Sequence, residues 1–220
     1  MKKLFSLLIA FSLCLASTAP AFAASGISTV PDGQVVCDND DYKATVQRSE
    51  EELIVTVEYA DRYEITTREY DSDNIVTQVF NYDGTLINSY STIMPDPNAP
   101  VPYDYYQHTF SNYEYDVDTT SQRHEVWTCR REDDYKTKTR LPGSERLLLL
   151  WKQEVDNIND AEKDIILGAG ATVISAVVNS VKAGQIGAAI ALVGGAADMV
   201  DAIDNLYDSY NTADNIFDQL

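Results

Sequence analysis

The sequence IILGAGATVISAVVNSVKAGQIGAAIALVGGAA occupies residues 165–197, and Lys182 is its single charged residue. It divides into two apolar runs, 165–181 and 186–197, with a short segment between them that can form a turn. This pattern predicts a helical hairpin. Six glycines lie between residues 168 and 195, although a glycine inside a soluble helix costs about 1 kcal/mol relative to alanine. The glycines therefore indicate close packing, or a helix that need not be stable in water.

Small residues recur at every fourth position of the hairpin, and residues four apart share one face of a helix. Such a face allows a second backbone to approach closely, as in the tightly packed helical hairpins often found in membranes. The alternative is a hairpin buried in the core of a soluble helical domain. The predicted membrane hairpin uses two rows, one formed by Gly168, Thr172, Ala176, Ser180 and Gly184 and the other by Ala183, Gly187, Ala191 and Gly195.

The residues around the hairpin predict a helical domain over 141–220. Pro142 suits a helix start, and the helix formers of 147–151 follow it. Asn159-Asp160 predicts a break, with a new helix from Ala161. After the hairpin, one helical face carries acids and the opposite face is apolar, which predicts an amphipathic last helix. The acids are Asp198, Asp201, Asp204 and Asp208, and the apolar residues are Met199, Val200, Ile203, Leu206 and Tyr207.

Residues 24–140 have the period-two alternation of β-strands. Leu53, Val55 and Val57 alternate with more polar residues, and about eight short strands are expected in this region. Asp83-Gly84 is a favoured pair for a two-residue type I′ hairpin between strands 75–82 and 85–91. The chain is thus predicted to be α+β, with an N-terminal antiparallel β domain, a sandwich or an open barrel, followed by the helical domain.

The first 23 residues have the pattern of a signal peptide. Lys2 and Lys3 precede the apolar run 4–16, and Ala21-Phe22-Ala23 supplies small residues for cleavage after Ala23. A lipoprotein signal at Cys14 fits less well, because Leu13 rather than a small residue precedes it. We therefore expect a secreted, extracellular protein.

Removal of the signal leaves two cysteines, Cys37 and Cys129. Two cysteines in an exported chain predict a disulfide, here one that closes a loop of about 90 residues. Two free thiols are the alternative. Together with His108 and His124 these cysteines lack the paired spacing of zinc ligands.

Composition and motifs exclude several classes of function. The 220 residues carry 35 Asp plus Glu against 16 Lys plus Arg, a formal charge of −19, which argues against a nucleic-acid partner. The sequence has none of the common catalytic or phosphate-binding motifs, so we expect no enzymatic activity, no cofactor and no metal. The acidic stretches 38–41 and 71–73 could ligate calcium, but they lack a complete calcium loop. Tyrosines at 103–106 could form a carbohydrate or partner surface.

An exported chain with a β-rich front and the Gly/Ala-rich hairpin 165–195 resembles large secreted, heat-labile bacteriocins of the geobacillin type. The hairpin is also similar in style to those of pore-forming colicins. The resemblance is one of pattern, without a specific motif. It implies an antimicrobial protein that permeabilises a target-cell membrane, directly or through a surface receptor, and an immunity protein in the producing cell. The alternative is an extracellular binding or structural module in which the hairpin is core.

The acidic charge bears on how such a toxin would approach a membrane, because attraction to anionic lipid cannot drive it. Asp198, Asp201, Asp204 and Asp208 oppose entry of the second apolar run into lipid while they are ionised. Protonation would lower this barrier, so the hypothesis expects membrane binding to strengthen at low pH.

Overall fold

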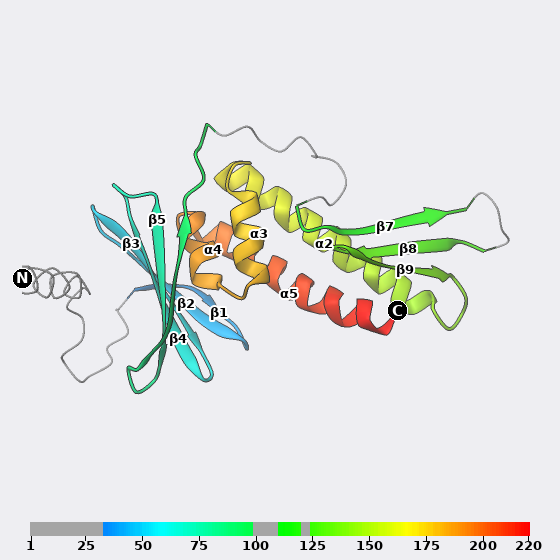
Figure 1. The fold of residues 1–220 in the computed structure, drawn as a ribbon, viewed down its shortest axis with the longest axis horizontal. Helices are drawn as coiled ribbons and strands as arrows, with labels where there is room; N and C mark the ends of the chain where they lie inside the picture. Colours follow the sequence, from blue (N-terminus) through cyan, green and yellow to red (C-terminus); the bar gives the residue numbers. More distant parts are fainter. Residues whose placement is uncertain (1–32, 99–109, 120–123) are drawn as a thin grey trace, which may run out of the picture.

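The computed structural model describes residues 33–98, 110–119 and 124–220. It shows an α+β protein in which four helices lie between two antiparallel sheets (Figure 1). The α+β class expected from the sequence is confirmed. The predicted signal peptide and the tyrosine-rich segment 103–106 lie outside the described residues.

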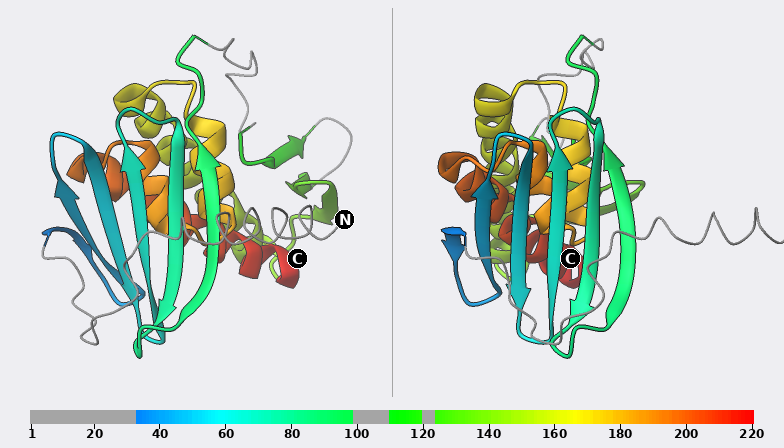
Figure 2. Two further views of the ribbon diagram at one scale, coloured as in Figure 1. Left: turned by 60° about the vertical axis from the view of Figure 1, so that its left-hand side comes forward. Right: turned by 90° about the vertical axis from the view of Figure 1, so that its left-hand side faces the viewer.

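The larger sheet is a meander of six strands in which every strand pairs with its neighbours in sequence (Figure 2). One face is covered by helices and is apolar in β3, where alternate residues point the same way and Leu53, Val55 and Val57 are fully buried. The strands are β1 (Gln34–Asp38), β2 (Tyr42–Arg48), β3 (Glu52–Tyr59), β4 (Arg62–Glu69), β5 (Asn74–Asn81) and β6 (Leu86–Ile93).

The hairpin predicted at Asp83-Gly84 is formed, but its loop is not the two-residue type I′ turn. The loop spans residues 82–85, where the amide of Gly84 donates to the carbonyl of Asn81 at 2.9 Å. Gly84 has a φ of +83°, whereas Asp83 is not among the described residues with positive φ. A type I′ turn needs positive φ at both central residues. The pairing register also shifts between Val79 and Phe80, so a bulge accommodates the longer loop.

The smaller sheet contains β7 (Tyr113–Asp118), β8 (Val126–Arg131) and β9 (Asp134–Thr139), paired in that order. It stands at the opposite end of the molecule from the larger sheet, and helices separate the two (Figure 1). The described strands therefore do not form the predicted sandwich or open barrel. Each sheet buries one face against helices instead of against the other sheet.

The helical part begins where the composition changes, but its internal boundaries differ from the prediction. The helix α2 passes through Asn159-Asp160 without a break, because Ile158, Ala161 and Ile165 continue one buried stripe. It ends at Gly170, whose φ of +95° leaves the helical region. The helices are α2 (Glu145–Ala169), α3 (Ile174–Lys182), α4 (Ile186–Leu192) and α5 (Ala197–Gln219).

The two long helices, α2 and α5, pack side by side and join the two sheets. Near the start of α5, Asp204 accepts hydrogen bonds from Asn39 at 2.7 Å and from the hydroxyl of Tyr42 at 2.8 Å, both from the larger sheet. Near its end, Asp218 accepts one from Arg131 of the smaller sheet at 3.0 Å. One continuous set of buried apolar side chains runs from the inner face of the larger sheet through the helices to Trp127.

Candidate functional site

The first row of predicted hairpin residues does not lie on one helix. Gly168 is in the last turn of α2, Thr172 is in the link after it, Ala176 and Ser180 are in α3, and Gly184 is in the turn before α4. The row is interrupted because Gly170 ends α2, so the predicted seventeen-residue apolar helix over 165–181 does not form. The predicted turn between the apolar runs is present, and the amide of Gly184 donates to the carbonyl of Val181 at 2.9 Å.

The second row does provide a close approach, but to the larger sheet rather than to another helix. A Cβ placed on Gly187 would lie 2.5 Å from Oγ1 of Thr66 in β4. A Cβ on Gly195 would lie 3.1 Å from Val46 in β2. Ala191, between them, is fully buried in α4. The small side chains thus let the backbone of α4 rest directly on the sheet.

The inner face of β4 is polar, and its residues contact the backbone of α4 from one end to the other. Near the start of α4 the amide of Gly187 donates to the carboxyl group of Glu64. At the other end, Nη1 of Arg68 donates to the carbonyl of Ala191 at 2.9 Å. Arg48, from β2, donates to the carbonyl of Gly195 at 2.6 Å. An acid at the amino end and arginines at the carboxyl end match the helix dipole, so this side of the sheet is built to hold α4.

Burial is complete along α4, where all seven residues are buried. In α3, Ile174, Val177, Val178 and Val181 face the core. None of the helices formed by the described residues is both long enough and apolar enough to cross a membrane. The hairpin therefore forms part of the core in this structure.

The two cysteines are free thiols in the structure, so the predicted disulfide is not formed. Cys37, in β1, lies beside Asn39 and thus near Asp204 of α5. Cys129, in β8, pairs with Lys136, which reaches the carbonyl of Phe217 near the other end of α5. Thirteen helical residues separate those two positions, a distance of about 20 Å. A disulfide needs Cα atoms within about 7 Å.

Thiol labelling should therefore find both Cys37 and Cys129 reactive once the protein is denatured without a reductant. In the native protein we expect slow labelling of Cys37, which is half-buried, and protection of Cys129, which is fully buried. Burial raises the pKa of both thiols, to about 12 for Cys129, and the thiolate is the reactive form. Mass spectrometry after alkylation measures this directly. A denatured chain that takes up no label would restore the disulfide.

An open cavity of about 380 Å³ lies where the smaller sheet meets α3 and α5. Its walls come from the start of β7, the β8–β9 turn, the end of α3 with the following turn, and the middle of α5. Three tyrosines, an asparagine and several charged side chains face it. The lining residues are Tyr113, Glu132, Val181, Lys182, Ala183, Gly184, Tyr207, Tyr210, Asn211 and Asp214.

Lys182, the single charge of the apolar segment, is held at the wall of this cavity. Its ammonium group donates to the carbonyl of Ser111 at 2.6 Å and to Oε1 of Glu132 at 3.0 Å. It also lies 5.1 Å and 5.5 Å from the ring centres of Tyr113 and Tyr210. Aromatic faces attract a cation at such distances. These contacts explain why a lysine interrupts the hairpin: it ties the end of α3 to the smaller sheet.

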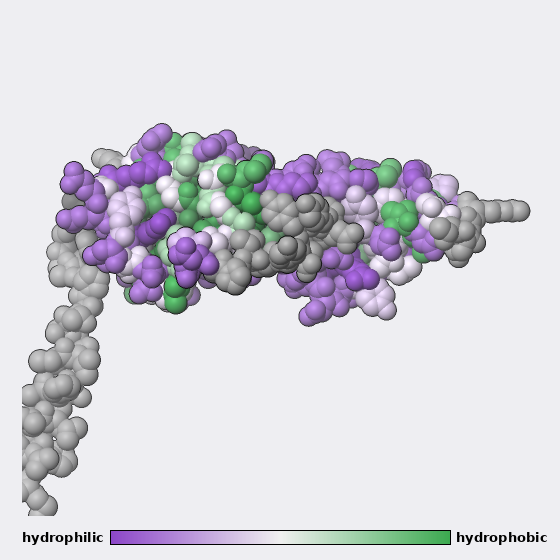
Figure 3. Space-filling view, turned by 90° about the horizontal axis from the view of Figure 1, so that it is seen from above, coloured by the Kyte–Doolittle hydropathy of each residue, from purple (hydrophilic) through white to green (hydrophobic). Residues whose placement is uncertain are grey.

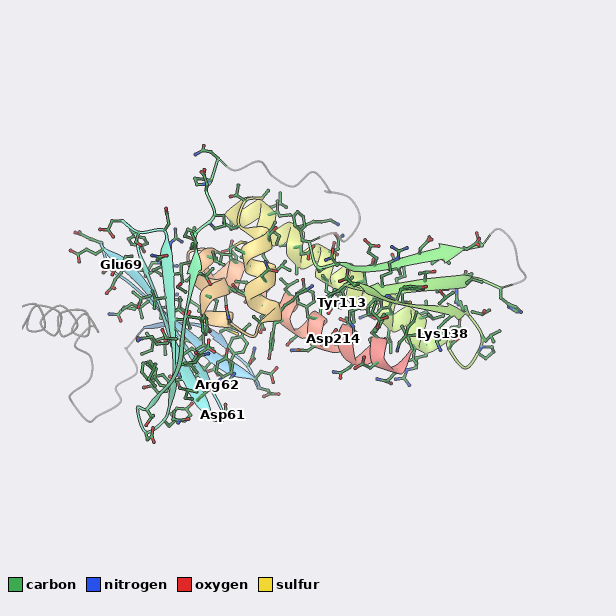
Figure 4. All side chains as sticks on the ribbon, in the orientation of Figure 1. Asp61, Arg62, Glu69, Tyr113, Lys138 and Asp214 are labelled. Carbon is green, nitrogen blue, oxygen red and sulfur yellow. The ribbon has the colours of Figure 1, made fainter. Side chains whose placement is uncertain are left out.

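The remaining charges of the cavity are also paired. The hydroxyl of Tyr113 donates to Oδ1 of Asp214 at 2.7 Å, and Figure 4 shows these two residues between β7 and α5. Arg131 lies 3.5 Å from the same carboxylate and 4.4 Å above the ring of Phe217. Burial, followed by the bond to Asp214, raises the pKa of Tyr113 well above its usual value. The tyrosine is therefore neutral over the physiological pH range.

Behind the cavity, Glu162 of α2 is 2% exposed. Burial raises its pKa to about 7, against the opposing effects of hydrogen bonds with Ser111 and Tyr210 and of the charge on Lys182. The hydroxyl of Tyr210 lies 3.4 Å from its Oε1. Glu162 is not among the lining residues, so the group whose charge changes near neutral pH lies behind Tyr210 and not in the cavity wall.

The predicted acidic face of α5 is present, although part of it is structural. Asp198 and Asp201 are exposed, whereas Asp204 is hydrogen-bonded to the larger sheet. Burial, followed by the charges of Asp204 and Asp41, raises the pKa of Asp208. Neither the 38–41 stretch nor the 71–73 stretch forms a metal site, because nowhere in the described ranges do three or more His, Cys, Asp or Glu side chains gather in a suitable arrangement.

Comparison of the chain with protein-family models, with curated proteins and with solved structures gives no match.

Proposed function

We propose that the protein is an exported, non-catalytic binding module whose ligand occupies the cavity beside Lys182. The ligand is a small, uncharged molecule rich in hydroxyl groups, such as a short saccharide. The observation that carries this proposal is the composition of the cavity: tyrosine rings, the amide of Asn211, and charges that are paired within the protein. Aromatic faces with a few convergent polar groups are the usual form of a small-molecule site.

The pairing of charges argues for an uncharged ligand. Lys182 is neutralised by Glu132, and Arg131 by Asp214 and Asp218. A charged ligand would have to break one of these pairs to find a partner. The net charge of −19 further opposes the approach of an anion. Hydroxyl groups, by contrast, can exchange hydrogen bonds with the Asn211 amide, while the carbon-bound hydrogens of a sugar ring pack on tyrosine.

The binding test compares two asparagines on the same helix. Asn211 lines the cavity, whereas Asn215, one turn later, is exposed outside it. Titration of maltotriose and of chitobiose, followed by NMR shifts of α5 amides, should show binding of one or both. Asn211→Ala should weaken that binding about tenfold, the value of one lost hydrogen bond near 1.4 kcal/mol, and Asn215→Ala should leave it unchanged. Equal effects of both variants, or shifts outside the cavity, would contradict the proposed site.

A second candidate is the membrane-active antimicrobial protein that the resemblance implies. The observation that favours it is the apolar surface beside the hairpin, where Leu167 is 81% exposed at the end of α2. Seen from above (Figure 3), hydrophobic residues are more frequent over the end of the molecule that contains the larger sheet. The end with the smaller sheet is mainly hydrophilic (Figure 3). This function requires α3 and α4 to leave the core, because α4 is enclosed by the sheet.

A disulfide staple separates the two candidates. The Cβ positions of residues 66 and 187 would lie 3.4 Å apart, close to the spacing of a disulfide. In Thr66→Cys/Gly187→Cys the bond would fix α4 to β4. Because Gly187 and Thr66 are not among the residues that line the cavity, we expect saccharide binding to persist with and without reductant. Liposome leakage that appears only after reduction would instead support the membrane-active function.

A further inference from the structure

Three side-chain oxygens are buried beneath the start of α4 without a hydrogen-bond partner: the hydroxyls of Tyr59 and Tyr90 and Oε2 of Glu64. Across the described ranges, no other side-chain nitrogen or oxygen is buried without a partner. Glu64 itself is 3% exposed. Buried polar groups in native proteins nearly always have a partner, so three exceptions in one place require an explanation.

The three oxygens come from neighbouring strands and face the same side of the sheet. Glu64 of β4 is opposite Val57 of β3, so Tyr59 lies two residues further along β3 on the same face. Tyr90 of β6 is opposite Thr77, which is opposite Thr66 of β4. The carboxylate charge of Glu64 contributes to raising the pKa of both tyrosines, after burial, as expected for groups on one face of the sheet.

The surroundings close this space and leave few other partners. The amide of Gly187 donates to the Glu64 carboxyl group, and α4 contributes no titratable side chain. Thr66 and Thr77 are hydrogen-bonded to each other at 2.8 Å, and Thr77 also lowers the pKa of the neighbouring Tyr90 hydroxyl. At the edge, Arg62 lies over the ring of Tyr59 at 4.4 Å and pairs with Asp61 at the β3–β4 turn (Figure 4).

We propose that Glu64, Tyr59 and Tyr90 form an internal solvent site, in which one buried water molecule bridges the three oxygens. The water donates a hydrogen bond to Oε2 of Glu64 and accepts one from each tyrosine hydroxyl. Three polar partners are the usual number for a buried water. The site lies on the larger sheet, away from the cavity beside Lys182, and is independent of the proposed function.

The chemistry of Glu64 agrees with a water rather than with a fixed counter-ion. Burial raises the pKa of this carboxyl group to about 7, against the opposing charge of Arg62 and the hydrogen bond from Gly187. The group therefore changes between its neutral and ionised forms near physiological pH. Water can donate to Oε2 of the ionised form. When the neutral carboxyl group donates its proton, one tyrosine hydroxyl turns to accept from the water, so the same water serves both states.

The direction in which one substitution changes the stability of the protein tests the site. If a water bridges the oxygens, Tyr59→Phe removes one of its partners and should lower the folding equilibrium constant five- to tenfold in urea denaturation. Tyr59 is chosen because no side-chain hydrogen bond affects the pKa of its hydroxyl, whereas Thr77 lowers the pKa of Tyr90. If the site is dry, the same change removes an unpaired hydroxyl and should raise that constant, which would overturn the proposal. Tyr135→Phe is the matched control, because Tyr135 is 67% exposed and its hydroxyl can reach bulk water.

A second measurement shows what occupies the site. A high-resolution crystal structure of the whole chain should contain a solvent peak within hydrogen-bond distance of all three oxygens, at about 2.7–3.0 Å. The absence of such a peak, with direct bonds between the side chains, would overturn the proposal.

A comparison of two salts tests whether a cation occupies the site. Sodium chloride should stabilise the protein no more than choline chloride does above pH 7. A specific gain with sodium would show a bound cation in place of the water.

Discussion

Ala189→Asp is expected to unfold the helical part of the protein. Ala189 is fully buried in the middle of α4, between the larger sheet and the other helices. Arg48 and Arg68, the nearby cations described above, already donate to the carbonyls at the end of α4. A new carboxylate would therefore be buried without a partner, which costs about 3–5 kcal/mol. That loss is a large part of the stability of a domain of ordinary size.

Urea denaturation followed by far-UV circular dichroism measures this effect. Ser175→Asp is the matched control, because Ser175 is exposed in the first turn of α3, where an acid suits the helix dipole. The control should unfold at the parent midpoint. A folded Ala189→Asp variant with an unchanged midpoint would show that α4 is not held against the sheet, and would favour the membrane-active function.

Trp151→Ala is expected to loosen the attachment of the smaller sheet. Trp151 of α2 is fully buried, with its ring centre 5.9 Å from that of Tyr113 in β7 and 5.4 Å from that of Phe217 in α5. Its indole N–H donates to the carbonyl of Glu114 at 3.1 Å. Removal of the ring leaves a cavity at the junction of three elements and should cost about 3–5 kcal/mol.

Trp151→Phe separates packing from the hydrogen bond. It retains most of the ring contacts and loses the bond to Glu114, so we expect a smaller loss, of about 1 kcal/mol for the bond plus the effect of reduced ring volume. Hydrogen exchange should show reduced protection of β7–β9 in the alanine variant before protection falls in the larger sheet. Equal losses for the two variants would contradict the importance of the ring contacts.

Much of the secondary structure could be predicted because its signals are local. The alternation at Leu53, Val55 and Val57 is enough to identify a half-buried strand, and the acidic and apolar faces of α5 follow directly from helical spacing. The helix boundaries were less accurate. Asn159-Asp160 is a helix-breaking pair in isolation, but tertiary packing of the apolar stripe on either side of it keeps α2 continuous.

The role of the small-residue row was harder to predict, because the same spacing serves a helix packed on a helix and a helix packed on a sheet. The missing signal was in β4, where Arg62, Glu64, Thr66 and Arg68 alternate as a polar row in a central strand. A polar row on a covered face requires partners, and the backbone of a helix with small side chains supplies them. Which face of β4 is covered depends on the pairing register, which the sequence of one strand does not specify.

The cavity beside Lys182 could not be predicted from sequence spacing. Tyr113, Lys182 and Asp214 are far apart in the chain and meet because α5 passes both α3 and β7. One sequence feature could have indicated it: a lone lysine in an apolar run must find a partner when that run is buried. The disulfide predicted between Cys37 and Cys129 is not formed. The number of residues between two cysteines in the chain does not determine how close they lie in space.

The order of elements in the chain has a consequence for the kinetics of folding. The sheet β1–β6 is built from neighbouring strands and can form early, but its apolar face is covered by residues that are synthesised much later. Arg48 and Gly194 are 146 residues apart, and Asn39 and Asp204 are 165 apart. Closing such long loops is slow. During synthesis, the nascent sheet therefore exposes an aggregation-prone surface until α4 and α5 emerge. We expect the yield of folded protein to depend on a chaperone that binds extended apolar strands.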